Sequence, residues 1–254
     1  MSRVLLETRD LTVRFGGHVA VDSVSCAFRS GELTAIVGPN GAGKTTYFNL
    51  ISGQIPAASG RVALDGRDIT RASVSQRTAL GIGRAFQLTN LFPNLSVLEN
   101  VRLVMQARSK TGFRLLTMAA SLHDLTEQAE AVLARVRLLD RAGQTVSALS
   151  HGDQRKLEVA LLIALDPLVY MFDEPTAGMS VDEAPVVLDL IADLKAQTDR
   201  TILLVEHKMD VIRSLADRII VLHNGALAAD GPPAEVMASA VVQEAYMGKD
   251  LADV

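Results

Sequence analysis

The sequence lacks the features that define disulfide-bonded, membrane-spanning and secreted proteins. Its single cysteine, Cys26, cannot form an internal disulfide and indicates a reducing compartment. No run approaches the roughly 18 apolar residues that cross a bilayer, because Glu158 and Asp166-Pro167 interrupt the most apolar region, 157–172. The start of the chain, residues 1–7, meets charge again at Glu7, too soon for the apolar run of a signal peptide. We therefore expect a chain that does not cross a membrane by itself.

The sequence also has no excess of basic residues, with 25 Lys and Arg against 29 Asp and Glu. The net charge is −4 and the isoelectric point is about 5.7, so no basic field is available for nucleic acid. We found no internal repeat, low-complexity tract or long linker. Apolar residues make up 48% and charged residues 21% of the 254 positions, which is ordinary globular usage and enough for a substantial core. Cys26, between Val24 and Phe28, is expected to be a small buried hydrophobe.

The most informative segment is Gly-Pro-Asn-Gly-Ala-Gly-Lys-Thr-Thr at residues 38–46, which fits the pattern G-x-x-x-x-G-K-[ST]. An apolar strand is predicted at 34–37 before it, and a helix is predicted from Lys44 to Leu50, ending at Gly53. Glycines let successive backbone N–H groups converge on a polyphosphate, and the positive end of the helix adds to them. Lys44 would reach the β- and γ-phosphates, and the Thr45 hydroxyl would bind Mg²⁺. The alternative, an ordinary glycine-rich turn, is disfavoured by these flanking elements.

The order of apolar patterns predicts an α/β fold. Strand patterns fill residues 4–36 and 61–64, and helical spacing dominates 88–160. Continuous apolar runs at 168–172 and 201–205 predict central parallel strands, with a helix at about 181–197 between them and a closing hairpin at 218–230. The chain is therefore expected to be one domain, 1–254. Residues 1–87 and 161–254 would form its α/β core, and residues 88–160 an inserted helical subdomain.

Two acids, Asp173 and Glu174, directly follow the predicted strand 168–172. An acid at that strand tip can hold Mg²⁺ opposite Lys44 and Thr45. A second carboxylate beside it is explained if Glu174 polarises the attacking water. The competing interpretation, that the acids only cap the next element, is less favoured beside a phosphate loop.

Leu149-Ser150-His151-Gly152-Asp153-Gln154 opens a predicted helix and resembles the Leu-Ser-Gly-Gly-Gln signature of ATP-binding cassette proteins. In that family the phosphate loop, the signature and the Asp-Glu pair occur in this order. The resemblance spans about residues 4 to 250. It implies a P-loop ATPase fold with a mostly parallel core sheet, an N-terminal antiparallel β subdomain and the inserted helical subdomain.

The resemblance also implies roles for individual residues. Gln87 matches the Mg²⁺-sensing glutamine, His207 the switch histidine that contacts the γ-phosphate, and Phe15 the aromatic that stacks on adenine. The catalytic set is Glu174, His207 and Lys44, and the Mg²⁺ ligands are Thr45, Gln87 and Asp173. The implied nucleotide-binding residues are Phe15, Gly38, Pro39, Asn40, Gly41, Ala42, Gly43, Lys44, Thr45, Thr46, Gln87, Ser150, His151, Gly152 and Asp153.

Three positions depart from the family pattern. His151 replaces the first signature glycine, Asp153 stands where glutamine is usual, and Ser180 stands where aspartate is frequent. Asp153 is expected to place negative charge near the partner subunit's nucleotide. Either Gln154 compensates for that charge, or the site completed by this signature is the weaker one. The remaining histidines, among them His18, lack metal-ligand spacing and are expected at the surface.

Within the family the chain looks most like the ATPase subunits of importers for branched-chain amino acids and related amides or urea. This resemblance rests on residues 86–87, 91–100 and 206–209 and on the tail 245–248. The implied cofactors are ATP and Mg²⁺. The implied partners are a second ATPase subunit, with a heterodimer favoured, transmembrane permease subunits and, indirectly, a solute-binding protein. The implied location is peripheral, on the cytoplasmic face of the inner or plasma membrane.

Two alternatives remain open from the sequence. One is the ATPase of a lipopolysaccharide-export system, which shares the short chain and a Tyr-x-Gly tail. The other is a soluble cassette ATPase acting on ribosomes or DNA, a class that usually carries two cassettes or basic additions.

Overall fold

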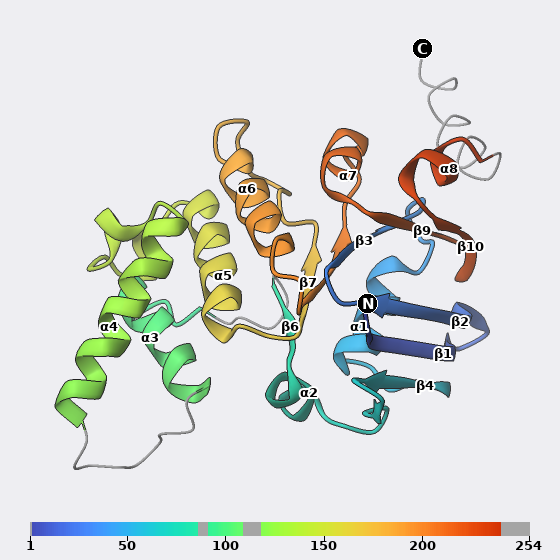
Figure 1. Ribbon diagram of the computed structural model, residues 1–254, viewed down its shortest axis with the longest axis horizontal. Helices are drawn as coiled ribbons and strands as arrows, with labels where there is room; N and C mark the ends of the chain where they lie inside the picture. Colours follow the sequence, from blue (N-terminus) through green and yellow to red (C-terminus); the bar gives the residue numbers. More distant parts are fainter. Residues whose placement is uncertain (1, 86–90, 109–117, 240–254) are drawn as a thin grey trace. The chain divides into compact units, whose positions relative to one another are not determined.

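A computed structural model of the protein describes residues 2–85, 91–108 and 118–239 (Figure 1). The chain divides into two compact units. Unit 1 comprises residues 1–82, 168–174 and 195–254, and unit 2 comprises residues 83–167 and 175–194. The elements of unit 1 are β1 (Val4–Phe15), β2 (His18–Arg29), β3 (Glu32–Val37), α1 (Lys44–Ser52), β4 (Ser59–Leu64), β5 (Arg67–Asp68), α2 (Val74–Leu80), β7 (Val169–Asp173), β8 (Thr201–Val205), α7 (Met209–Leu215), β9 (Arg218–His223), β10 (Ala226–Gly231) and α8 (Pro233–Met237).

The elements of unit 2 are mainly helical. They are α3 (Val97–Arg108), α4 (Met118–Arg135), two short 3-10 turns (Leu139–Arg141 and Val146–Ala148), α5 (His151–Leu165) and all but the last residue of α6 (Ala184–Lys195). The short strand β6 (Ile82–Arg84) begins at Ile82, the last residue of the first segment of unit 1, and continues into unit 2.

A mostly parallel sheet forms the centre of unit 1, with strands in the order β10-β9-β3-β8-β7. β3 pairs in parallel with both β8 and β9, and β7 pairs in parallel with β8. Each of these runs is apolar throughout because both faces of a central parallel strand are covered. The antiparallel pair β9–β10 closes through Asn224 and Gly225, which both adopt positive φ as a two-residue hairpin turn requires. The predicted parallel sheet and closing hairpin are confirmed.

Alternate residues of the central strands enter two different hydrophobic clusters. Ile36 and Ile220 belong to the cluster that contains the buried face of α1 and the inner residues of β1 and β2. Their neighbours Val37 and Ile219 belong to the second cluster, with Ile212 of α7 and Val236 of α8. Because of this period-2 alternation, the sheet is packed between two apolar layers. The carboxyl ends of its parallel strands, where ligands bind in such folds, therefore have fixed positions.

The N-terminal strands form a separate antiparallel sheet in the order β2-β1-β4-β5, in which β1, β2 and β4 lie side by side (Figure 1). Cys26 of β2 is buried in the cluster beneath it, as predicted. The sequence suggested several short strands over residues 4–28, and the structure contains two of twelve residues each. The register shifts within the β1–β2 pair, near Asp10 and Ser23, let each strand continue through polar positions.

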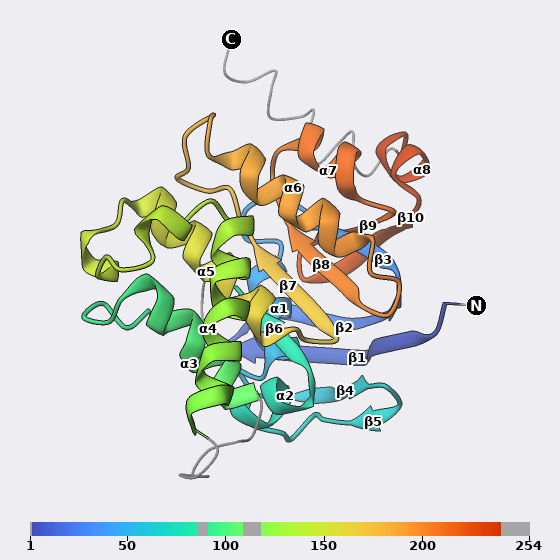
Figure 2. The same ribbon diagram turned by 60° about the vertical axis from the view of Figure 1, so that its left-hand side comes forward.

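Unit 2 is built around α3, α4 and α5, which contact one another (Figures 1 and 2). The helical spacing predicted within residues 88–160 is seen on α4, where Ala129 and Leu133 are buried. α5 begins at His151 because Ser150 caps it: the Ser150 hydroxyl accepts a hydrogen bond from the Asp153 N–H. α6 begins at Ala184, three residues after the predicted start.

Candidate nucleotide-binding site

The loop between β3 and α1 follows a path that only glycine allows at two positions. Gly38 has φ +153°, and a Cβ there would lie 2.2 Å from the carbonyl oxygen of Leu222. Gly43 has φ +97°, and a Cβ there would lie 2.4 Å from the carbonyl oxygen of Ala20. The loop is thus pressed against the backbone of two strands. Gly43 caps α1 without any side-chain hydrogen bond, so the first N–H groups of α1 keep their capacity for an anion.

Lys44, the first residue of α1, is held inside this loop. Its Nζ donates hydrogen bonds to the carbonyl oxygens of Gly38, at 2.6 Å, and Pro39, at 3.0 Å. Only 7% of the residue is exposed. Burial lowers the pKa of the Lys44 ammonium, and the charges of Glu174 and Asp173 oppose that shift. A buried cation that donates to two carbonyl oxygens is suited to an anionic ligand.

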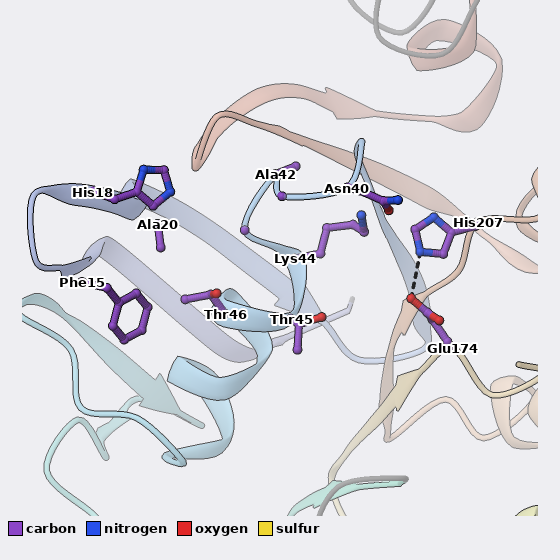
Figure 3. Close-up of a pocket in the computed structure, with 12 residues that line it drawn as sticks. Phe15, His18, Ala20, Asn40, Ala42, Lys44, Thr45, Thr46, Glu174 and His207 are labelled. Atoms are coloured by element: carbon purple, nitrogen blue, oxygen red, sulfur yellow. Dashed lines mark hydrogen bonds and ion pairs between the residues drawn. The ribbon is translucent and has the colours of Figure 1, made fainter. Parts of the chain in front are cut away.

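The two predicted acids stand at the carboxyl end of β7. Asp173 is the last residue of that strand and pairs in register with Val205 of β8. Glu174 has φ +52°, an unusual conformation for this residue type, and its N–H donates to the carbonyl oxygen of Val205 at 2.9 Å. The turn at Glu174 directs its carboxylate toward His207, whose Nε2 lies 2.8 Å from Glu174 Oε1 (Figure 3).

A single pocket of 390 Å³ collects most of the predicted residues, all from unit 1 (Figure 3). Phe15 and His18 lie at one end, and Lys44, Glu174 and His207 lie at the other. A flat aromatic side chain at one end and a lysine-lined loop at the other match the two ends of a nucleoside triphosphate. The predicted residues that line the pocket are Phe15, Asn40, Gly41, Ala42, Gly43, Lys44, Thr45, Thr46, Glu174 and His207.

The other predicted residues lie elsewhere. Gly38 and Pro39 shape the loop and hold Lys44 through their carbonyl oxygens. Ser150, His151, Gly152 and Asp153 open α5 in unit 2. Gln87 lies outside the described residues.

The structure corrects the expectation for the Asp153 side chain. The residue is only 4% exposed, and its carboxylate contacts Arg141, Lys156 and the Ser150 hydroxyl. Burial alone would raise the pKa of this carboxyl. The hydrogen bonds from Lys156 and Ser150, with the charges of Lys156 and Arg141, outweigh burial and place the pKa below its usual value. The negative charge is therefore neutralised within unit 2 and is not presented at the surface.

Sequence reasoning missed two residues that line the pocket, His18 and Ala20. His18 was expected simply at the surface. It is exposed, but it pairs with Phe15 across the β1–β2 hairpin and lies at the same end of the pocket (Figure 3). Because side chains two apart on a strand share a face, His18 and Ala20 reach the pocket together. The pairing of the hairpin, with Gly16 and Gly17 as its turn, was the signal that could have identified them.

Two further observations bear on cations and membranes. Over the described residues, no three His, Cys, Asp or Glu side chains cluster tightly enough to bind a metal ion on their own. Nor does any helix in residues 2–85, 91–108 and 118–239 have the length and apolar character that crossing a bilayer needs.

Comparison with known proteins agrees with this geometry. The profile of the ABC transporter family matches residues 21–177, and that of the branched-chain amino acid ATP-binding cassette transporters matches residues 227–252. The chain is 37% identical to the high-affinity branched-chain amino acid transport ATP-binding protein LivG of Salmonella typhimurium, over 98% of this chain and all of that protein. It is 34% identical, with the same coverage, to the corresponding protein BraF of Pseudomonas aeruginosa.

Solved structures give the same result. A nucleotide-free ATP-binding cassette from an ABC transporter superposes with a TM-score of 0.80 at 28% identity, covering 97% of this chain and all of that one. An ADP-bound cassette of an ABC transporter gives the same TM-score, identity and coverage. The chain therefore belongs to the ABC transporter family, as an ATP-hydrolysing, LivG-like ATP-binding subunit of the branched-chain amino acid group.

Proposed function

We propose that the chain hydrolyses ATP with Mg²⁺ in the pocket between Phe15 and His207, and that hydrolysis drives import of branched-chain amino acids or related amide- or urea-type solutes. The observation that carries the ATPase part is the placement of Phe15, Lys44, Glu174 and His207 around one pocket. The solute class is supported by the match of residues 227–252 and by the relatives LivG and BraF, which are branched-chain amino acid transport ATP-binding proteins.

In the proposed reaction each side chain has one task. Phe15 stacks on the base, while the loop amides and Lys44 bind the phosphates. Glu174 accepts a hydrogen bond from the attacking water and orients it toward the γ-phosphorus. His207, whose Nε2 lies 2.8 Å from Oε1 of Glu174, limits the rotation of that carboxylate and would also contact the γ-phosphate. The Lys44 ammonium and the positive N-terminal end of α1 stabilise the negative charge that develops on the phosphoryl oxygens.

The residues present fit a magnesium ion that is shared with the nucleotide. Magnesium is commonly bound by one or two protein oxygens together with phosphate oxygens and water. The Thr45 hydroxyl and the Asp173 carboxylate, with Gln87, are the proposed protein ligands. Such an ion, when bound, neutralises charge on the β- and γ-phosphates.

We further propose that a second ATPase subunit, different from this chain, covers the nucleotide. Ser150, His151, Gly152 and Asp153 at the N-terminus of α5 would in turn face the partner's nucleotide, since a helix N-terminus suits a phosphate. Residues 88–160 would act as the inserted helical subdomain that signals to transmembrane permease subunits, and a solute-binding protein would deliver the solute. The chain would then lie on the cytoplasmic face of the membrane as a peripheral subunit.

Two experiments test the proposal at separate levels. Lys44→Ala should abolish nucleotide affinity, whereas Glu174→Gln should retain ATP binding and lose hydrolysis; turnover unchanged by both substitutions would refute the ATPase assignment. Purification of the tagged chain from a mild-detergent extract should recover permease subunits and a solute-binding protein. Recovery of envelope-assembly proteins instead would refute the import assignment and favour lipopolysaccharide export.

A further inference from the structure

A continuous path of hydrogen bonds and ion pairs runs through unit 2. It leads from Ser150, directly before α5, to Ser180, in the loop that follows Glu174. At its first end, the Ser150 Oγ lies 3.0 Å from Oδ2 of Asp153. The Ser150 Oγ also accepts the Asp153 N–H at 3.1 Å. An ionised carboxylate only accepts hydrogen bonds, so the Ser150 hydroxyl proton points at Asp153. The side chain of Asp153 therefore fixes the turn that precedes α5.

The path continues through Lys156 to Glu183. The Lys156 Nζ lies 3.0 Å from Oδ1 of Asp153 and 3.7 Å from Oε1 of Glu183. The other carboxylate oxygen of Glu183 accepts hydrogen bonds from Ser180, from its N–H at 3.3 Å and its hydroxyl at 3.0 Å. Lys156 thus bridges an acid on α5 and an acid just before α6.

Gly152 provides an independent observation of the same contact. A Cβ built on Gly152 would lie 2.3 Å from both carboxylate oxygens of Glu183. No side chain fits there while Glu183 keeps its place. Because this carboxylate is the far end of a flexible side chain, a larger residue at position 152 would displace it from its contacts with Lys156 and Ser180.

Charge and burial make this path costly to interrupt. Asp153 and Lys156 are 4% and 9% exposed, and Arg141 provides a second cation at Oδ2 of Asp153. The two negative charges of Asp153 and Glu183 are thus matched by the two positive charges of Lys156 and Arg141. Removing one member of a buried ionic set leaves its partner charged and desolvated, which costs more than the contact itself is worth. A second pair on α5, Arg155 and Glu158 with 3.1 Å between Nη1 and Oε2, has the same i, i+3 spacing but does not include Glu183.

We propose that Asp153, Lys156 and Glu183 are positioning residues that join the signature turn at Ser150 to the loop ending at Ser180, so that the two segments move as one body. The inference deepens the proposed function, on which its catalytic consequence rests: both segments would meet the second ATPase subunit in one fixed arrangement. It also accounts for the acid at position 153: its carboxylate is an internal anchor, which leaves the N-terminus of α5 to face the partner's nucleotide.

The mechanical part is tested on the full chain without nucleotide. Hydrogen exchange of backbone amides should accelerate at both 150–153 and 176–183 in Lys156→Met, and Lys156→Arg should restore slow exchange. The matched control Arg155→Gln should leave 176–183 unchanged. In denaturation, Lys156→Met and Glu183→Gln should be non-multiplicative in the unfolding constant by about fivefold or more. Multiplicative constants, or acceleration confined to α5, would overturn the proposal.

The catalytic part is tested on the chain assembled with its partner subunits. Lys156→Met should lower kcat about tenfold or more with KM for ATP nearly unchanged, because the pocket lined by Phe15 and Lys44 is not altered. Lys156→Arg should recover most of kcat. Loss in KM alone, or an Arg variant no better than Met, would contradict a positioning role. If the unmodified assembly fails to hydrolyse ATP, the proposed function fails, while the exchange result still decides whether the two segments are joined.

Discussion

Nε2 of His207 and Oε1 of Glu174 lie 2.8 Å apart, across the ends of the neighbouring parallel strands β8 and β7. The backbone of His207 is also fixed, because its N–H donates a hydrogen bond to Oε2 of the buried Glu206 at 2.8 Å. The Glu174 backbone is tied to β8 through the carbonyl oxygen of Val205. The acid is therefore oriented before any substrate arrives, by contacts that come from the adjacent strand.

This relationship predicts separate effects of His207→Ala on stability and on turnover. The pair is more than a third exposed on both sides, so its loss should change the free energy of unfolding by no more than about 1 kcal/mol. ATP hydrolysis should fall about a hundredfold, because the glutamate loses its orienting partner. Steady-state hydrolysis and urea denaturation of the same protein measure both. His223→Ala, at the exposed last residue of β9, is the control. Normal turnover in His207→Ala would remove the orienting role.

Two glycines of the phosphate loop, Gly43 and Gly41, differ in how closely other atoms surround them, and their alanine variants should differ accordingly. Gly43→Ala should abolish nucleotide binding and destabilise the fold, because its Cβ would meet the Ala20 carbonyl oxygen at 2.4 Å, a backbone atom that cannot swing away. Gly41→Ala, at φ +81° with nothing within 4 Å, suffers only the positive-φ strain of about 1–2 kcal/mol. Calorimetric titration with ATP and thermal denaturation compare the two variants. Equal damage from both would show that strain, and not the close approach, decides.

The hairpin end of the pocket predicts a part for His18 in nucleoside recognition. A neutral imidazole offers one donor and one acceptor, and His18 stands beside Phe15 at the end away from Lys44 (Figure 3). His18→Ala should weaken ATP binding by about three- to tenfold, the value of one hydrogen bond. Binding of inorganic tripolyphosphate should not change, because it lacks the nucleoside. His123→Ala, on the exposed side of α4, is the control. A loss of tripolyphosphate affinity equal to that of ATP would contradict the prediction.

Much of the core could be predicted because its signals are local. The strand Thr201–Val205 matches its apolar run at both ends. α1 ends at Ser52, directly before Gly53, whose φ of +82° suits the residue after a helix. The phosphate loop is read from its spacing alone. Such signals depend on neighbours along the chain, so a single sequence contains them.

The features that were missed depend on partners distant in sequence. The burial of Asp153 follows from Arg141 and from Lys156, which contacts Glu183, 27 positions later, and no periodicity in the sequence indicates those contacts. The start of α6 was placed too early because Val181 continues an apolar pattern, yet it is 89% exposed in the structure. The role of His18 required the pairing of β1 with β2.

Arg77 of α2 was not singled out from the sequence either, and it supports the end of α1 opposite the phosphate loop. Its guanidinium donates to four carbonyl oxygens, those of Leu50, Ile51, Thr70 and Ala72, at 2.6 to 3.1 Å. Burial lowers the pKa of this group, and the charge of Asp68 opposes the shift. A cation at the C-terminal end of α1 also compensates the negative end of the helix dipole.

Arg77→Met should therefore lower the free energy of unfolding by about 3–5 kcal/mol, because buried carbonyl groups at the end of α1 lose their donors. Arg77→Lys should recover only part of this loss, since an ammonium cannot reach the same set of acceptors with the fixed geometry of a guanidinium. Urea denaturation followed by circular dichroism measures both. Arg67→Met, at an exposed arginine of β5, should shift the value by less than about 0.5 kcal/mol. If Arg77→Met proved as stable as Arg67→Met, the four hydrogen bonds would be compensated elsewhere, and α1 would not depend on this side chain.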